Sequence, residues 1–127
     1  MSFRFEAGQG LIIVPAELWG PAGSAVLRLA LDTGATRTLI NVGLLVALGY
    51  DPALESDRIQ VTTGSGVEFA PNVRLKKIVS LGQERTDFAV LAHTLPPSAG
   101  VDGLLGLDFM RDKRLTVDFG AGTLTLA

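Results

Sequence analysis

The sequence predicts an all-β protein with one or two short helices, and three observations support this fold class. Glycine is abundant, at 15 of 127 residues, as in chains that turn often. Apolar and polar residues alternate in several short segments, with the two-residue period of half-buried strands. One segment carries both the start and the stop signal of a helix. With 47% hydrophobic and 19% charged residues the chain is too apolar for disorder, and we expect residues 1–127 to form a single domain.

Two strands are expected in the first quarter of the chain. Leu11–Leu18 is rich in strand-forming residues, and Pro15 within it favours an outer strand because proline has no backbone N–H. After a Gly-Pro-Ala-Gly turn, Ala25–Leu31 alternates in polarity. Its leucines fall on one side, which is expected to face the core.

The strongest helix signal follows a short strand at Thr38–Ile40. Asn41 is expected to cap the free N–H groups of a helix with its side chain. The helix is expected to run from Val42 to about Leu48, and Gly49 to end it in the left-handed conformation.

The rest of the chain is predicted to form mainly hairpins around glycine turns. The expected strand pairs are 59–63 with 67–69, 73–81 with 85–92, and 115–119 with 123–126. Between them, a loop is expected over Leu95–Gly100, a short buried strand over Gly103–Leu105 and a helical turn over Leu107–Asp112. The first hairpin has the tip Gly64-Ser65-Gly66, which is able to adopt positive φ.

A single aspartate stands directly after the Ala25–Leu31 strand, and Thr33-Gly34-Ala35-Thr36 follows it. A strand end holds a carboxylate rigidly, glycine lets backbone N–H groups approach its oxygens, and the threonine hydroxyl can lock the turn. Hydrolysis of a peptide without a metal or a covalent intermediate needs two carboxyl groups, one to accept a proton and one to donate a proton. Asp32 supplies half of such a pair. Its alternative interpretation is an ordinary turn residue.

The segment Leu31-Asp32-Thr33-Gly34-Ala35-Thr36 resembles the active-site motif of the aspartic proteases. Val101–Met110, with the sequence VDGLLGLDFM, resembles the second signature of the retropepsin-like members, in which two apolar residues and a glycine lead into a short helix. The order of parts is also similar, with paired strands before the motif, a helix after it and a flap hairpin at residues 59–69. The resemblance implies the closed barrel of a retropepsin-like acid protease.

The resemblance also implies an aspartic endopeptidase that acts on peptide or protein substrates as a homodimer. Because the chain has one Asp-Thr-Gly, Asp32 and its symmetry mate would form the catalytic dyad of a C2 dimer. Thr33 would grip the partner's matching turn. Support of the active-site loop is implied for Thr33, Gly34, Ala35, Thr36, Leu104, Leu105 and Gly106, and closure over a bound peptide for Gly64, Ser65 and Gly66. No cofactor or metal is implied.

Two features differ from the retroviral members of that family. A predicted hairpin follows Asp112, whereas the retroviral chains end in a strand of the dimer's terminal sheet. Leu107 and Asp108 stand where those enzymes carry an Arg-Asn pair, so the ion pair that supports the active-site loop is expected to be missing. The predicted C-terminal hairpin leaves a second interpretation open, a catalytically silent retropepsin-like module that binds peptides or dimerises.

Charge and hydropathy disfavour nucleic-acid and membrane partners. The net charge is −2 and the basic residues are scattered, so a broad positive field is not expected. The apolar run Leu11–Val14 is too short for a signal peptide or a membrane span. We therefore expect a cytoplasmic protein, unless the sequence is a fragment of a longer, membrane-anchored one.

Other hydrolytic chemistries find little support in the sequence. There is no cysteine, and His93, the only histidine, lacks a nucleophile motif beside it. The acidic residues that lack the spacing of a metal site are Asp51, Glu55 and Asp57. Those that could complete a dyad within one chain, but are not followed by Thr/Ser-Gly, are Asp102, Asp108, Asp112 and Asp118.

Overall fold

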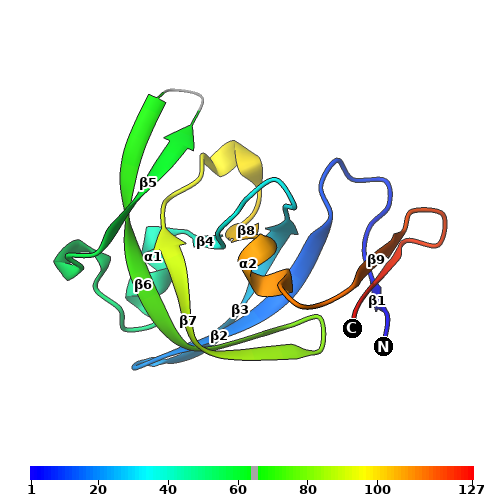
Figure 1. The fold of residues 1–127 in the computed structure, drawn as a ribbon, viewed down its shortest axis with the longest axis horizontal. Helices are drawn as coiled ribbons and strands as arrows, with labels where there is room; N and C mark the ends of the chain where they lie inside the picture. The colour runs from blue at the N-terminus through cyan, green and yellow to red at the C-terminus, as the bar shows by residue number, and fades with distance from the viewer. Residues whose placement is uncertain (64–65) are drawn as a thin grey trace.

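A computed structural model describes residues 1–63 and 66–127 of the chain (Figure 1). Within these residues the strands are β1 Phe3–Arg4, β2 Ile13–Gly20, β3 Gly23–Leu31, β4 Leu39–Ile40, β5 Arg58–Thr63, β6 Gly66–Ser80, β7 Gln83–Ala92, β8 Gly103–Leu105, β9 Leu115–Asp118 and β10 Thr123–Leu126. The helices are α1 Val42–Ala47 and α2 Leu107–Met110, with the 3-10 turns η1 Pro52–Leu54 and η2 Pro97–Ala99.

Six of the strands close into a barrel. Their order is β2-β3-β8-β4-β7-β6, and the pairing of β2 with β6 completes the ring. β5 pairs with the first part of β6 and projects with it beyond the barrel (Figure 1). The predicted closed barrel is therefore confirmed, and the hairpins at 59–69 and 73–92 are present. Residues 64 and 65, part of the predicted glycine tip, lie outside the described residues.

β2 is not the outer strand that Pro15 suggested. It pairs with β3 along its whole length, and residues 16–19 also pair with residues 77–80 of β6. Pro15 itself lies just before the doubly paired part, where its missing N–H removes no ladder bond, and its carbonyl accepts a hydrogen bond of 2.8 Å from the hydroxyl of Ser80. The proline therefore marks where pairing with β6 begins.

The leucine side of β3 faces the core as predicted. Leu27 and Leu29 are 3% and 0% exposed, whereas Val26 on the other side is 65% exposed. The buried cluster that they join fills the barrel and includes the fully buried Phe109 of α2. Alternation of strand residues thus determines which face of the sheet is buried.

α1 begins at Val42 as predicted, but the predicted capping bond from Asn41 is absent. The side chain of Asn41 makes no capping bond and instead accepts a hydrogen bond of 2.9 Å from the N–H of Leu95. Gly49 follows the helix with a φ of +95°, as predicted. The amide of Asn41 therefore joins two distant loops, a use that local sequence does not reveal.

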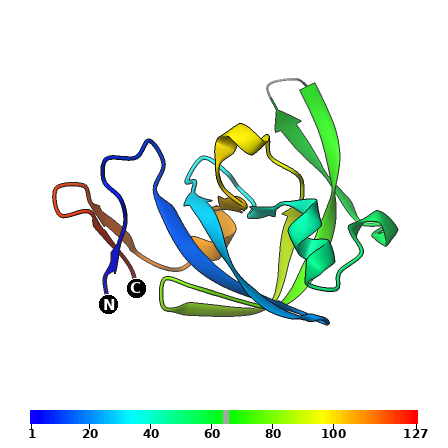
Figure 2. The same cartoon turned by 180° about the vertical axis from the view of Figure 1, so that it is seen from behind.

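The two ends of the chain meet in a second, smaller sheet with the order β1-β10-β9. The C-terminal hairpin was predicted, but the pairing of Phe3 and Arg4 with β10 was not. This terminal sheet lies beside the barrel, with the N- and C-termini close together (Figure 2). Leu124 and Leu126 of β10 belong to the same buried cluster as the barrel core.

Candidate active site

Asp32 lies immediately after β3, in a tight turn. Its N–H donates to the carbonyl of Leu105 at 2.9 Å, which attaches the turn to β8. The N–H of Gly34 donates to Oδ1 of Asp32 at 2.9 Å, and the N–H of Ala35 donates to the carbonyl of Asp32 at 3.1 Å. A β-carbon at Gly34 would lie 3.2 Å from Oδ1, so glycine allows this close approach. The half-buried carboxylate is thereby held in one place.

β8 passes between the two ends of the Asp32 loop. It pairs in parallel with β3 through Leu29–Leu31 and antiparallel with β4 through Leu39 and Ile40. Leu105 is fully buried in the core, whereas Leu104 points to the other side and lines a cleft beside Asp32. Alternation along one short strand therefore gives these two leucines different surroundings.

Steric constraints explain why the second signature has glycine at positions 103 and 106. A β-carbon at Gly103 would lie 2.1 Å from the carbonyl oxygen of Leu39. A β-carbon at Gly106 would lie 2.8 Å from the carbonyl oxygens of Ala35 and Arg37. Because β8 runs directly against the loop backbone at both points, the apolar-apolar-glycine pattern reports close backbone packing.

A buried hydroxyl and a carboxylate lock the far end of the loop. Thr38 is 0% exposed, and its Oγ1 donates to Oδ1 of Asp108 at 2.7 Å and accepts from the N–H of Gly106 at 3.1 Å. The N–H of Thr38 also donates to both carboxylate oxygens of Asp108, at 3.0 and 2.9 Å. The hydroxyl that locks this loop is therefore that of Thr38, whereas Thr33 is exposed.

The expectation that the loop lacks ionic support is wrong. Nε of Arg37 lies 3.7 Å from Oδ2 of Asp108, with the two side chains 27% and 13% exposed. Asp108 also accepts the N–H of Phe109 at 2.9 Å, at the start of α2. The support is present with different residues, since Asp108 supplies the carboxylate from α2 and Arg37 the cation from the loop itself. Asp108 is thus occupied by structural contacts.

The other acidic residues considered for a dyad within one chain lie elsewhere. Oδ2 of Asp102 accepts the N–H of Arg28 at 2.8 Å, and Oδ1 of Asp118 accepts the N–H of Ala121 at 2.9 Å. Asp112 is an exposed turn residue with a φ of +63°. Among the described residues that line the cleft beside Asp32, Asp32 is the only carboxylic acid.

This cleft has a volume of about 450 Å³ and lies between the Asp32 loop and β5. Its lining is mostly apolar, and the apolar members are Ala35, Leu39, Ile59, Val61, Leu91 and Leu104. Polar groups are contributed by Asp32, Thr36, Arg37, Gln60 and Thr62. An apolar cleft with a few polar groups and a carboxylate at one side has the usual character of a ligand-binding site.

The remaining predicted site residues are spread around the loop. Thr33 lines a separate hollow together with Leu107, Met110 and Leu115, on the side of α2. Gly64 and Ser65 lie outside the described residues, and Gly66 starts β6 with a φ of +130°. His93 follows β7, where its Nδ1 lies 3.7 Å from a carboxylate oxygen of Glu68 in β6.

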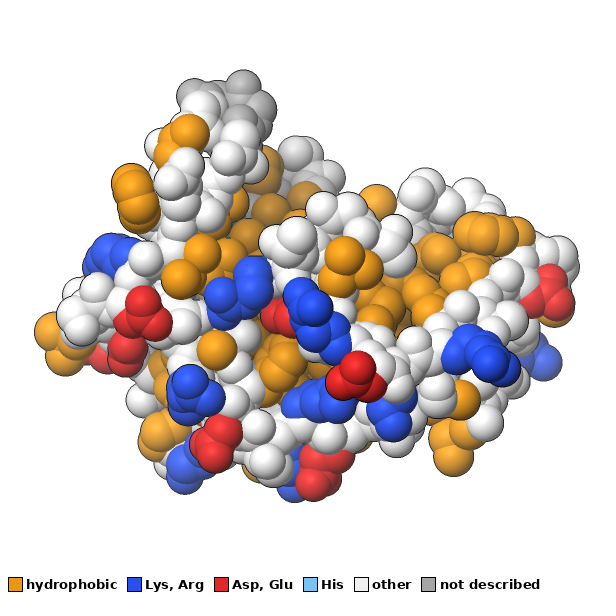
Figure 3. Space-filling view, in the orientation of Figure 1, with side chains coloured by type: hydrophobic (Ala, Val, Ile, Leu, Met, Phe, Trp, Pro, Cys, Tyr) orange, Lys and Arg blue, Asp and Glu red, His pale blue; other side chains and the backbone are white. Residues whose placement is uncertain are grey.

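Charge and metal-binding groups add no second site to this picture. On the face shown in Figure 3 the acidic and basic side chains are interspersed. In the part of the chain that the structure describes, no group of three or more His, Cys, Asp or Glu is placed to hold a metal ion. Nor does any helix there have the length and apolarity to cross a membrane.

Replacing Asp108 with alanine is expected to lower the free energy of unfolding by about 3 kcal/mol, because buried donors on Thr38 lose their acceptor and Arg37 loses its counter-ion. Urea denaturation measures the change. The matched control is Asp118→Ala, which removes an acceptor from an exposed turn and is expected to cost less than about 1 kcal/mol. Equal losses in the two variants would contradict the role assigned to Asp108.

Comparisons with known proteins agree with this geometry. The crystal structure of a retropepsin-like aspartic protease from Rickettsia conorii matches 99% of this chain and 88% of its own, with a TM-score of 0.74 and 17% sequence identity. Comparison with curated proteins gives no match. The closed barrel, with β8 passing through the Asp32 loop, is therefore a retropepsin-like fold.

The family follows from the sequence itself. A model of the aspartyl protease family matches residues 14–109, which include the Asp32 loop and all but the last residue of the second signature. The chain belongs to the aspartyl protease family.

Proposed function

We propose that this protein is an aspartic endopeptidase that acts as a homodimer, with one Asp32 from each protomer in the catalytic dyad. The observation that carries the proposal is the position of Asp32. It is the one carboxylic acid among the described residues that line the apolar cleft, and backbone N–H groups and β8 hold its turn in place. A site with half of a dyad is completed by a second copy under twofold symmetry.

The dyad hydrolyses a peptide bond by moving protons between two carboxyl groups. Like charges held close together cannot both ionise, so one Asp32 is ionised and the other is protonated, as is established for aspartic proteases in general. The ionised group accepts a proton from water while the water oxygen bonds to the peptide carbonyl carbon, and the protonated group donates to the carbonyl oxygen. The C–N bond then breaks as the nitrogen takes up a proton, which releases a carboxylic acid and an amine.

The surrounding residues serve binding and positioning in this proposal. Leu104 and the apolar side chains of β5 receive substrate side chains, while Gly34, Leu105 and Gly106 hold the loop. Thr33, with its neighbours Ala35 and Thr36, belongs to the loop that meets its symmetry mate. The hairpin of β5 and β6 acts as the flap, with the tip of Gly64, Ser65 and Gly66 that the sequence predicts. We take residues 1–127 as one domain, because Leu124 and Leu126 share the barrel core.

The concentration dependence of cleavage tests the proposal. The activity per chain on a peptide library at pH 4 to 6 is expected to rise in proportion to protein concentration where the chain is mostly monomeric, and to level off once the dimer dominates. Sedimentation over the same range locates the transition. Activity per chain that stays constant across the monomer-to-dimer transition would contradict the proposal. A dimer without cleavage at any concentration would do so too, and would favour the silent peptide-binding module.

A further inference from the structure

β6 changes its pairing partners at Asn72. Residues 66–71 of β6 pair with β5, whereas residues 72–80 pair with β7, and the last of these also with β2. Up to Pro71 the strand therefore belongs to the projecting hairpin, and from Asn72 onwards it belongs to the barrel (Figure 1). We call the two paired segments 58–63 and 66–71 the flap hairpin. Its orientation over the cleft is set where it joins the barrel.

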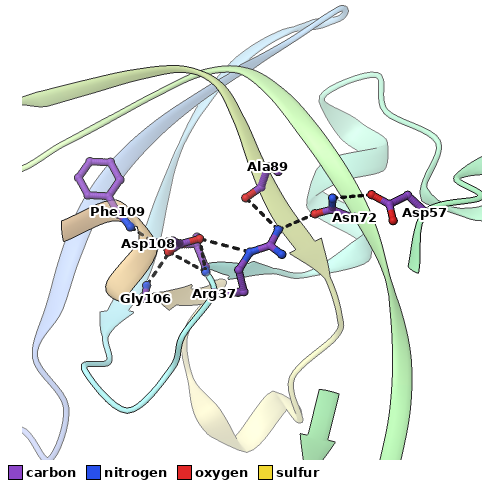
Figure 4. Close-up of polar contacts among 8 residues, drawn as sticks. Arg37, Asp57, Asn72, Ala89, Gly106, Asp108 and Phe109 are labelled. Atoms are coloured by element: carbon purple, nitrogen blue, oxygen red, sulfur yellow. Dashed lines mark hydrogen bonds and ion pairs between the residues drawn. The ribbon is translucent and has the colours of Figure 1, made fainter. Parts of the chain in front are cut away.

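Asn72 closes the base of the flap hairpin. Its N–H donates to the carbonyl of Asp57 at 2.8 Å, and its side-chain Nδ2 donates to Oδ2 of Asp57 at 2.8 Å. Asp57 directly precedes β5, so these bonds join the two strands of the hairpin at their common root. With Nδ2 used in this way, Oδ1 of Asn72 is free to accept a hydrogen bond from Arg37 (Figure 4).

Arg37 reaches from the Asp32 loop to this root. Its Nη2 donates to Oδ1 of Asn72 at 2.5 Å and to the carbonyl of Ala89 in β7 at 3.4 Å. On its other side, Nε faces Asp108 of α2 at 3.7 Å. The backbone of the next residue, Thr38, is bonded to the same carboxylate. One guanidinium thus joins the loop, α2, β7 and the root of the flap hairpin, while also lining the cleft.

We propose that Arg37 is a positioning residue that sets the orientation of the flap hairpin relative to Asp32, acting through Asn72. This inference rests on the proposed peptidase function for its effect on catalysis. Arginine suits the task because its planar group presents donors in several fixed directions at once. The lysine ammonium is a single point on a flexible stem, so Arg37→Lys is expected to keep the pairing with Asp108 and to lose the bond to Asn72.

Hydrogen exchange tests the link without depending on activity. In Arg37→Gln and in Asn72→Ala, the amides of the flap hairpin are expected to exchange on the order of tenfold faster, while those of β2 and β3 stay within a factor of about two. The matched control is Arg74→Gln. Arg74 is an exposed arginine of β6 that donates to the carbonyl of Asp87 at 2.8 Å and does not line the cleft.

Peptide cleavage by the dimer gives the second measurement. Both variants are expected to lower kcat/KM by roughly 10- to 100-fold, mainly through KM, because a misplaced flap holds the substrate less well. The double variant is expected to lose less than the sum of the two single losses, because both changes break the bond between Arg37 and Asn72. The kcat/KM of Arg37→Lys is expected to lie between those of the wild type and Arg37→Gln.

The two measurements distinguish failure of the positioning role of Arg37 from failure of the proposed peptidase function. If Arg37→Gln accelerates the exchange of the flap amides, relative to wild type, no more than it accelerates that of β2 and β3, the inference is overturned, whatever Asn72→Ala or the activity shows. Faster exchange in all strands alike would also overturn it, since that result describes a general loss of stability. Faster exchange confined to the flap hairpin supports the link. If the wild-type dimer then cleaves no peptide, the proposed function fails while the link stands.

Discussion

Replacing Asp32 with asparagine is expected to lower the rate of peptide cleavage by at least about a hundredfold, with fold and dimer unchanged. Asparagine is isosteric with aspartate and keeps an oxygen that can accept the N–H of Gly34, so the turn is preserved. It can neither accept a proton from water nor share one with its symmetry mate. Initial rates on a peptide substrate, with a sedimentation profile of the same samples, measure both effects.

Mixed dimers of wild-type and variant chains test whether the dyad is formed across the dimer. When wild-type and Asp32→Asn chains are mixed at a fixed total concentration, activity is expected to fall with the square of the wild-type fraction, because every mixed dimer has a broken dyad. Mixing with Asp118→Asn, which changes an exposed turn residue, is expected to leave activity unchanged. A linear fall in the Asp32→Asn mixture would show that each chain works alone, and would refute a dyad formed across the dimer.

Gly103→Ala is expected to lower the free energy of unfolding by about 3 kcal/mol or more. The new methyl group would stand 2.1 Å from the carbonyl oxygen of Leu39 and 3.1 Å from Cα of Ile40. Both contacts are with backbone, which no rotation of a side chain can relieve. Because β8 pairs with β3 and β4 at this point, the strands that frame the Asp32 loop must separate. Urea denaturation with an unchanged m-value measures the loss.

Gly43→Ala is the matched control for this change. Gly43 lies in α1, and apart from its chain neighbours and the backbone of its own helix no heavy atom comes within 4 Å of an added β-carbon. The same methyl group is therefore expected to be neutral or to stabilise the protein by up to about 1 kcal/mol, because glycine is a poor helix former. Similar losses in the two variants would contradict the steric explanation of the second signature.

Patterns that depend on neighbouring residues predicted much of the fold. Alternation placed the leucines of β3 in the core, and Gly103–Leu105 has the predicted bounds. The turn between β6 and β7 includes residue 81, which was expected to end a strand, since Leu81 and Gly82 both have positive φ. The break expected between residues 69 and 73 is a change of pairing partner within one continuous strand. The boundary between the two predicted strands is real, but whether it is a break or a change of partner depends on which strands lie alongside.

The candidate site, too, could be predicted from the sequence only where it depends on adjacent residues. The position of Asp32 after a strand and before a tight turn could be predicted, because it depends on adjacent residues. The partnership of Thr38 with Asp108 could not, since seventy residues separate them and only the closed barrel brings them together. Arg37 and Asn72 were missed for the same reason. An arginine directly after a site motif, and a polar residue beside a strand proline, are the signals that could have indicated them.

The terminal sheet has a consequence for where and when the protein works. β1, β9 and β10 find their partners within one chain, so a protomer can satisfy these backbone groups before it meets another copy. Under the proposed function, a newly made chain is then a folded but inactive monomer. The local concentration of identical chains decides whether dimers form and proteolysis begins. Under that function, the concentration of the protein controls cleavage, through its synthesis and dilution.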